Sequence, residues 1–292
     1  MQGRIIKGIG GFYYIHTLFD EVYECKAKGI FRNKKIKPLV GDRVEISVID
    51  QQEKKGNIVE ILPRKNQLIR PAVSNIDQVL VIFATTKPSP NLNLLDRFLI
   101  TMEEYGVEAV ICFHKKDIAE EEEIQRLSSI YQECGYRVLF TSTREQDGIL
   151  PIREILKEKT TVLAGPSGVG KSSIINLINP DANMETGDIS RKIERGKHTT
   201  RHSELFFLGE DTFIMDTPGF STLYVNHIEA SELKKYFKEF HSYEQQCRFQ
   251  GCIHINEPDC GVKAALEQGN INKNRYENYI TIYEELKLQK KY

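Results

Sequence analysis

The stretch Thr160-Thr-Val-Leu-Ala-Gly-Pro-Ser-Gly-Val-Gly-Lys-Ser-Ser173 decides the fold of this 292-residue chain. Val162–Ala164 is an apolar run typical of a buried strand, and an amphipathic helix is predicted over Ser173–Ile178. Between them, the spacing Gly165-x-x-x-x-Gly170-Lys171-Ser172 predicts a phosphate-binding P-loop. An ordinary glycine-rich turn before a helix is the simpler alternative, but it does not explain why strand, loop and helix all fall where phosphate binding needs them.

In such a loop, backbone N–H groups surround the β-phosphate at the N-terminus of a helix. Lys171 would reach the β- and γ-phosphates, where we also expect it to act in catalysis, and the Ser172 hydroxyl would bind Mg²⁺. The residues predicted to contact the nucleotide phosphates are Gly165, Pro166, Ser167, Gly168, Val169, Gly170, Lys171, Ser172 and Ser173.

The base is predicted from a second motif, which follows a buried strand at Glu108–Phe113. A carboxylate at the carboxyl end of a parallel strand can accept hydrogen bonds from both N1–H and the N2 amino group of guanine, a donor pair that adenine lacks. GTPases use Asn/Thr-Lys-x-Asp for this purpose. Here the residues predicted to bind guanine are His114, Lys115, Lys116 and Asp117, with His114 in place of the usual Asn. A charged strand end is the alternative.

Ser142 and Thr143 follow a third predicted strand, Tyr136–Thr141. GTPases place a loop here whose backbone contacts guanine O6, so both residues are predicted to bind the nucleotide. Ser-Thr after a strand is common, and by itself the pair indicates little.

Two further segments are predicted to sense the γ-phosphate and Mg²⁺. The polar stretch 180–201 ends in Gly196-Lys-His-Thr-Thr-Arg201, and a Thr in such a loop can close on Mg²⁺. Asp216-Thr-Pro-Gly219 follows another strand, so Asp216 would hold the Mg²⁺ shell through water and the Gly219 N–H would touch the γ-phosphate. The predicted Mg²⁺ ligands are Ser172, Thr199, Thr200 and Asp216, with the choice between the two threonines open.

Phe220 stands where many GTPases have a Gln that orients the attacking water. We therefore expect slow intrinsic hydrolysis and take His198 as the candidate that positions the water, because it titrates near neutral pH, with Thr199 and Thr200 as catalytic neighbours. A solvent-exposed His in an ordinary surface loop is the alternative.

The motifs appear in an unusual order, since the guanine motif precedes the P-loop. A compact fold tolerates such a circular permutation, because its termini can be joined and reopened at a surface loop. The fold predicted for the middle of the chain is therefore a circularly permuted P-loop GTPase domain. Its second nucleotide-sensing loop leads directly into the C-terminal part, so hydrolysis is expected to move that part.

Residues 1–68 read as about five short strands separated by turns, which suits an OB-type β-barrel, or an SH3-like barrel as the alternative. Residues 1–70 carry 14 Lys and Arg against 8 Asp and Glu, whereas the remainder carries 26 against 33. A basic N-terminal segment on an otherwise acidic chain favours contact with a polyanion through that segment. The predicted RNA-binding residues are Lys26, Lys28, Arg32, Lys34, Lys35 and Lys37, beside aromatics such as Phe12. The simpler alternative is that these residues are solvent-exposed charges with no partner.

The C-terminal part contains Cys247-x4-Cys252-x-His254-x5-Cys260. Three thiolates and an imidazole form a complete tetrahedral set with no open position, which predicts one structural Zn²⁺. The module is small, so zinc would supply much of its folding free energy. The other three cysteines lie apart in apolar surroundings and are expected to be buried, reduced thiols.

No apolar run is long enough for a membrane span, and the first ten residues carry no signal-peptide pattern. We therefore expect a cytoplasmic protein without membrane association.

Together, these motifs closely resemble the RsgA family of circularly permuted, small-ribosomal-subunit-dependent GTPases. The resemblance covers nearly the whole chain. It implies a multidomain α/β protein with an OB-type RNA-binding domain (1–68), a permuted GTPase domain (69–221) and a helical zinc domain (222–292). It further implies late maturation of the small ribosomal subunit, binding to its rRNA, stimulation by the subunit and release after hydrolysis of GTP to GDP. His114 departs from the family pattern.

A monomer is expected, and other subunit assembly factors stay open as partners. Two other classes remain at this point: a P-loop ATPase or kinase, which Asp117 disfavours, and a nucleotide-gated RNA-binding module with negligible catalysis.

Overall fold

The computed structural model describes residues 1–29, 31, 36–69, 71–180, 204–216 and 225–289. Its chain forms two compact units, each taken by itself below. The first unit comprises residues 1–79, 151–164 and 171–220, and the second comprises 80–150, 165–170 and 221–292. The predicted functional residues that lie outside the described residues are Arg32, Lys34, Lys35, His198, Thr199, Thr200 and Gly219.

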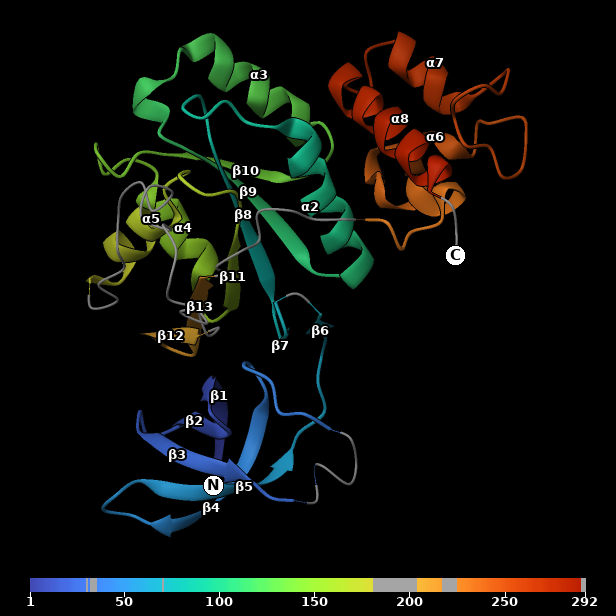
Figure 1. Ribbon diagram of the computed structural model, residues 1–292. Helices are drawn as coiled ribbons and strands as arrows, with labels where there is room; N and C mark the ends of the chain where they lie inside the picture. Colours follow the sequence, from blue (N-terminus) through green and yellow to red (C-terminus); the bar gives the residue numbers. More distant parts are fainter. Residues whose placement is uncertain (30, 32–35, 70, 181–203, 217–224, 290–292) are drawn as a thin grey trace, which may run out of the picture. The chain divides into compact units, whose positions relative to one another are not determined.

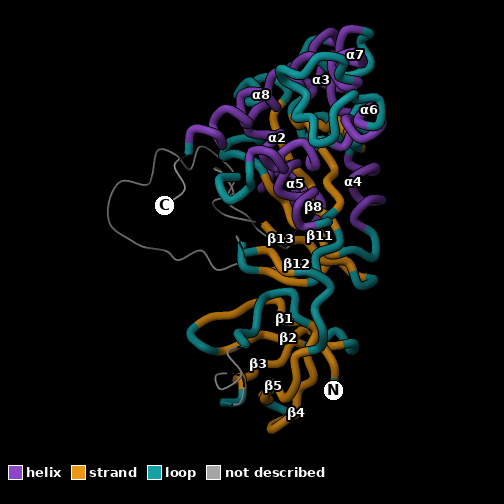
Figure 2. The backbone as a smooth tube through the Cα atoms, turned by 90° about the vertical axis from the view of Figure 1, so that its right-hand side faces the viewer, coloured by secondary structure: helices purple, strands orange, loops and turns teal. Residues whose placement is uncertain are grey.

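A closed barrel opens the first unit. Its strands are β1 (Gln2–Ile9), β2 (Phe12–Thr17), β3 (Val22–Ala27), β4 (Arg43–Asp50) and β5 (Lys55–Ile61). They run in the order β1-β2-β3-β5-β4, and β4 pairs back onto β1 (Figures 1 and 2). β3 and β5 are parallel and the other pairs antiparallel, the order of a Greek-key barrel of OB type. The prediction of a five-stranded OB-type barrel is confirmed.

Alternation of buried and exposed residues explains why these segments are strands. Ile5, Ile15, Tyr23, Val44 and Ile58 point inward and are fully buried, while polar neighbours face outward. Phe31, which the sequence places among the lysines, belongs to this core and is only 7% exposed. The short strands β6 (Gln67–Leu68) and β7 (Val73–Ser74) follow the barrel.

The rest of the first unit is an α/β element. β11 (Thr160–Ala164) runs parallel to β13 (Thr212–Asp216), and β12 (Glu204–Gly209) forms an antiparallel hairpin with β13. β12 also pairs with β1 of the barrel, where Lys7 lies opposite Glu204 and forms an ion pair with it at 2.8 Å. The barrel and the hairpin therefore share one hydrogen-bonded edge.

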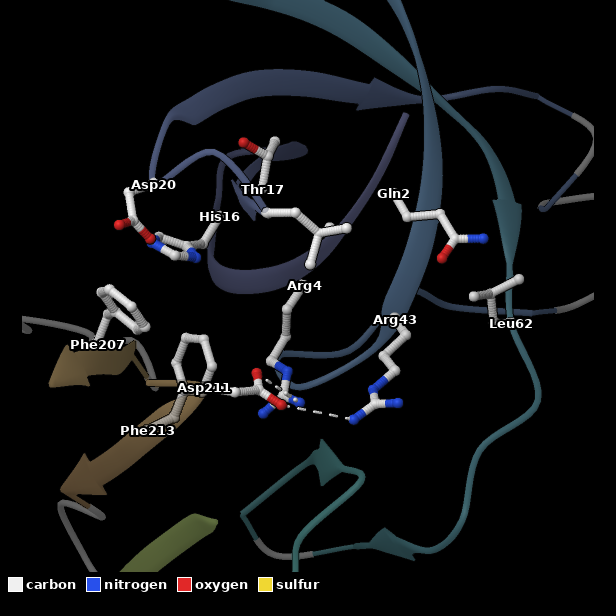
Figure 3. A pocket seen from close by; sticks show the side chains of 12 residues that line it. Gln2, Arg4, His16, Thr17, Asp20, Arg43, Leu62, Phe207, Asp211 and Phe213 are labelled. Carbon is white, nitrogen blue, oxygen red and sulfur yellow. Dashed lines mark ion pairs between the residues drawn. The ribbon is translucent and has the colours of Figure 1, made fainter. Parts of the chain in front are cut away.

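The buried side chain of Arg4 also connects the barrel with the β12–β13 hairpin (Figure 3). Its side chain is buried, donates a hydrogen bond to the Thr160 hydroxyl, and stacks over Phe213 with 4.4 Å between the guanidinium carbon and the ring centre. Asp211 lies between Arg4 and Arg43, with oxygen-to-nitrogen distances of 3.5 and 3.9 Å. One buried cation thus links β1, β11 and the hairpin.

The second unit holds β8 (Gln78–Ala84, whose first two residues belong to the first unit), β9 (Glu108–His114) and β10 (Arg137–Thr141) in the order β10-β9-β8. β8 is buried along its whole length, as expected for a strand covered on both faces. Phe83 of β8 packs edge-on against Phe98 of α2 (Leu92–Tyr105), and Phe113 of β9 packs against Tyr131 of α3 (Glu121–Gln132).

Helix α2 begins and ends where its sequence predicts. The Asn91 side chain accepts a hydrogen bond from the Leu94 amide at the N-terminus. Gly106, with a φ of 62°, ends the helix in the left-handed conformation. Both signals are local. The spacing of Leu95, Phe98, Leu99 and Met102 also predicts a helix over Leu92–Tyr105, and the structure confirms it.

The remaining helices are α4 (Ile149–Leu156), α5 (Lys171–Ile178), α6 (His241–Glu244), α7 (Gly261–Glu267) and α8 (Lys273–Leu288), together with the 3-10 helices η1 (Lys116–Ile118), η4 (Ala230–Tyr236) and η5 (Lys238–Phe240). The sequence predicts a single helix over Ala230–Phe240, which is wrong: the structure has the two 3-10 helices η4 and η5 there, because Phe237 leaves the helical conformation with φ −103° and ψ 82°. The sequence predicts an apolar core stripe in the C-terminal helix, made of Tyr276, Tyr279, Ile282, Tyr283 and Leu286. In α8 these residues are buried except Tyr283, which is partly buried and packs against the same core.

Cys25, Cys112 and Cys134 are buried and free, as predicted. Within the described ranges, none of the helices combines the length and apolar character needed to cross a membrane.

Candidate functional site

Two glycines of the predicted P-loop are required by the packing of the second unit. Gly165 has a φ of 137°, and a Cβ there would lie 2.0 Å from the Ile82 carbonyl oxygen of β8. Gly170 has a φ of 103°, and a Cβ there would lie 2.3 Å from Cδ2 of His114. Larger residues would push the loop off the strand and off the guanine motif. The P-loop and His114, far apart in sequence, therefore touch in the fold.

Lys115 ties the same two segments together. Its backbone is left-handed, with a φ of 63°. Its ammonium group donates hydrogen bonds to the Gly168 carbonyl of the P-loop at 2.8 Å and to the Lys87 carbonyl at 2.6 Å. A Lys in the second place of the guanine motif thus acts here as a clamp on the P-loop backbone.

Asp117 is oriented by the loop after β10. The Ser142 hydroxyl donates to Asp117 Oδ1 at 2.8 Å and accepts from the Glu145 amide at 3.1 Å. Beside them, Lys116 forms an ion pair with Asp147. Sequence reasoning assigned Ser142 a backbone role only. In the structure its side chain fixes the carboxylate that is predicted to read the base.

His114 is buried, with 3% of its surface exposed. Its Nδ1 lies 2.9 Å from the Thr141 hydroxyl and its Nε2 lies 3.3 Å from the Thr143 hydroxyl. Burial, aided by the charge of Lys115, lowers the pKa of His114 to about 4. The ring is therefore neutral at physiological pH.

The first unit carries the other motifs. α5 begins at Lys171, so Lys171, Ser172 and Ser173 form its first turn. The parallel pairing of β11 with β13 sets Asp216 opposite Leu163, one residue before β11 ends and two before the P-loop begins. The backbone thus places the start of the Asp-x-x-Gly segment beside the strand that leads into the P-loop.

The predicted zinc ligands come together. The ligand atoms of Cys247, Cys252, His254 and Cys260 all lie within 4.8 Å of one another. The Sγ atoms of Cys247 and Cys260 are 3.8 Å apart, and His254 Nδ1 lies 3.6 and 3.4 Å from them. Zn–S bonds of about 2.3 Å in a tetrahedron require ligand separations of about 3.8 Å. The donor set and its geometry therefore fit Zn²⁺.

Two contacts position His254, one to its imidazole and one to its backbone. Glu244 Oε1 lies 3.1 Å from His254 Nε2, which leaves Nδ1 toward the cysteines. The Tyr276 hydroxyl donates to the His254 carbonyl at 2.6 Å. Glu244 was missed in the sequence, although its place three residues before Cys247 was an available signal.

Three of the predicted RNA-binding lysines are described, and Lys26, Lys28 and Lys37 are all exposed. Lys26 of β3 lies opposite Phe12 of β2, with its ammonium 5.0 Å from the ring centre. A cation beside an accessible aromatic ring is suited to a backbone phosphate and a stacked base.

Comparisons with known proteins agree with this geometry. A family described as RsgA GTPase matches residues 61–226, and one described as RsgA N-terminal domain matches residues 2–58. A protein of Agathobacter rectalis called "Small ribosomal subunit biogenesis GTPase RsgA" is 58% identical over 302 residues, covering 100% of both chains.

Two solved structures are also similar over their length. YjeQ from Thermotoga maritima has a TM-score of 0.86 at 35% identity, with 99% of each chain covered. YloQ, described as a circularly permuted GTPase, has a TM-score of 0.83 at 38% identity, covering 100% of this chain and 96% of its own. The permuted GTPase fold predicted from the order of the motifs is thereby confirmed. The chain belongs to the RsgA family of GTPases.

Proposed function

We propose that the chain hydrolyses GTP to GDP and phosphate in late maturation of the small ribosomal subunit, binds the rRNA of that subunit and leaves it after hydrolysis. The observation that supports the proposal is the ordered arrangement of the predicted guanine loop, residues 114–117. Asp117 is oriented by Ser142, and Lys115 joins the same loop to the P-loop carbonyl of Gly168. Family membership and the names of the relatives supply the ribosomal subunit.

The proposed nucleotide contacts follow the motifs. Gly165–Gly170 and the first turn of α5 would surround the phosphates, and His114–Asp117 with Ser142 and Thr143 would enclose the base. Ser172, Asp216 and one of Thr199 and Thr200 would hold Mg²⁺, which supplies charge neutralisation at the phosphates. His198 is the proposed residue that positions water, on the sequence grounds given above.

The proposed division of labour assigns RNA contact to the barrel of residues 1–68, nucleotide chemistry to residues 69–221 and a structural Zn²⁺ to residues 222–292. Lys26, Lys28 and Lys37, together with Arg32, Lys34 and Lys35, form the proposed RNA-binding face. We further propose a cytoplasmic monomer, with other assembly factors as additional partners.

The decisive experiment is GTP hydrolysis by the purified chain, with and without purified small ribosomal subunits. We expect slow turnover alone and a rate at least tenfold higher with subunits, while ATP is not hydrolysed. Large ribosomal subunits are the matched control and should not stimulate.

Two results would contradict the proposal in different ways. Equal hydrolysis of ATP and GTP would make the chain a general P-loop ATPase. Binding of GTP and RNA with no turnover, even with small subunits present, would leave a nucleotide-gated RNA-binding module.

A further inference from the structure

We propose that His114 positions the P-loop and the loop after β10 but does not read the base, so that its side chain gives guanine N7 no hydrogen bond. This deepens the proposed function and depends on it. It specifies which edge of guanine this chain contacts, given that a His stands in the first place of its guanine motif.

The first step is the hydrogen bonding of the ring. A neutral imidazole has one donor and one acceptor nitrogen. Both nitrogens of His114 face Thr hydroxyls, Thr141 at 2.9 Å and Thr143 at 3.3 Å. A hydroxyl can donate or accept, so either tautomer of the ring is satisfied by these two partners. Cys112, 3.4 Å from the Thr141 hydroxyl, extends the chain into the core of β9.

The second step is the position of the ring against the P-loop. A Cβ on residue 170 would lie 2.3 Å from Cδ2 and 2.7 Å from Nε2 of His114. The same ring edge that faces Thr143 therefore also faces the Gly170 backbone. His114 is a spacer between two loops, with Nε2 at this contact and Nδ1 turned toward Thr141 at the end of β10.

The third step concerns what guanine presents. One edge offers the N1–H and N2 donors, and the other offers the acceptors N7 and O6. Asp117 can serve only the donor edge. The acceptor edge needs N–H groups, but the Lys115 ammonium is held at the P-loop by two of its three N–H donors, and both His114 nitrogens have Thr partners. We therefore expect guanine to be recognised mainly through its N1–H and N2 donors by Asp117, with O6 accepting hydrogen bonds from backbone N–H groups.

Nucleotide analogues test this without any mutation. Equilibrium affinities of the full-length protein would be measured for GDP, 7-deaza-GDP, which lacks N7, and IDP, which lacks the N2 amino group. We expect 7-deaza-GDP to bind within about twofold of GDP and IDP to bind at least tenfold more weakly, the loss expected for one hydrogen bond to a charged group. A tenfold loss with 7-deaza-GDP would overturn the inference.

His114→Ala then separates positioning from reading. We expect GDP and 7-deaza-GDP to lose affinity by the same factor, about tenfold, because the loops lose their spacer while the base loses nothing. A loss confined to GDP would show that His114 donates to N7, and no loss for either would show that it is no spacer. Each result overturns the inference.

Thr143→Val, which removes only the Nε2 partner, is the milder variant. It should weaken both nucleotides equally and by less than His114→Ala does, and a loss confined to GDP would again overturn the inference. Failure of GDP itself to bind the wild-type protein would instead overturn the proposed function.

Discussion

Asp117 is the residue on which we expect nucleotide choice to depend most directly. Its carboxylate is held by the Ser142 hydroxyl at 2.8 Å, so it does not have to be ordered when the base arrives. The ammonium of Lys115, two residues earlier, donates hydrogen bonds to two backbone carbonyls of the protein. In the proposed site, Asp117 would select the base, whereas Lys115 holds the loop to the P-loop.

Asp117→Asn is expected to lower GDP affinity about 100-fold, because an amide cannot accept from both N1–H and N2. It should raise affinity for xanthosine diphosphate, whose C2 carbonyl can accept from the new NH₂ group. Competition against a fluorescent GDP measures both. Asp147→Asn, which alters only a half-exposed partner of Lys116, is the control and should leave the preference unchanged.

The buried His114 also predicts a pH dependence of stability. Its pKa is lowered to about 4 in the fold, whereas an unfolded His has a pKa of about 6.5. Between these values the unfolded chain binds the additional proton, so stability present above pH 6.5 is lost as the pH falls toward 4.

On lowering the pH from 7 to 5, we expect protonation of His114 in the unfolded chain to reduce the free energy of unfolding by about 1 kcal/mol, after allowance for partial solvation. Urea denaturation at the two pH values, for the wild type and His114→Gln, measures the difference. An identical pH dependence in both proteins would contradict the assignment.

At the scale of elements, helix α8 joins α2 through a buried ionic network within the second unit. Arg275 is fully buried, and its guanidinium lies 2.5 Å from Asp96 of α2 and 2.7 Å from Glu239 of η5. Asn278 of α8 also donates to Asp96, and Tyr131 of α3 does so at 3.1 Å. The C-terminal helices therefore share polar contacts with the helices that flank β8 and β9.

Arg275→Ala should destabilise the protein by about 3 to 5 kcal/mol, because two buried carboxylates lose their cation. Guanidinium denaturation followed by circular dichroism measures this. Lys273→Ala, two residues earlier in an exposed ion pair, is the control and should change stability little. Equal effects of the two substitutions would show that the network is not a source of stability.

The proposed zinc centre gives a second prediction at this scale. Glu244→Gln is expected to weaken Zn²⁺ affinity about 10- to 100-fold, since Glu244 orients the His254 ring. Competition with a chromogenic chelator measures the affinity. Cys134→Ala changes a buried thiol outside the cluster and should keep the wild-type value, whereas unchanged affinity in Glu244→Gln would remove its orienting role.

At the scale of the whole molecule, sequence patterns predicted most elements because their signals are local. The barrel strands alternate, and α2 carries its own cap residues. The helix α4 was not predicted, because Pro151 lies near its start and reads as a breaker, although Pro is tolerated in a first turn.

Long-range polar contacts could not be predicted. Arg275 and Asp96 are 179 residues apart, and neither carries a local pattern that names the other. The contacts of His114 with Thr143 and Gly170 were missed for the same reason. Motif chemistry, in contrast, requires particular residues at fixed spacing, so the sequence could propose the zinc ligands and the guanine loop, and the structure brings the three cysteines and His254 together.

The central claim is that motifs encoded out of their usual order build one guanine-nucleotide site. Competition of GDP and ADP against a fluorescent GDP on the wild-type protein with Mg²⁺ tests it most directly. The account predicts that GDP displaces the probe at micromolar concentration and that ADP fails at a thousandfold excess. Displacement by ADP as readily as by GDP would contradict it.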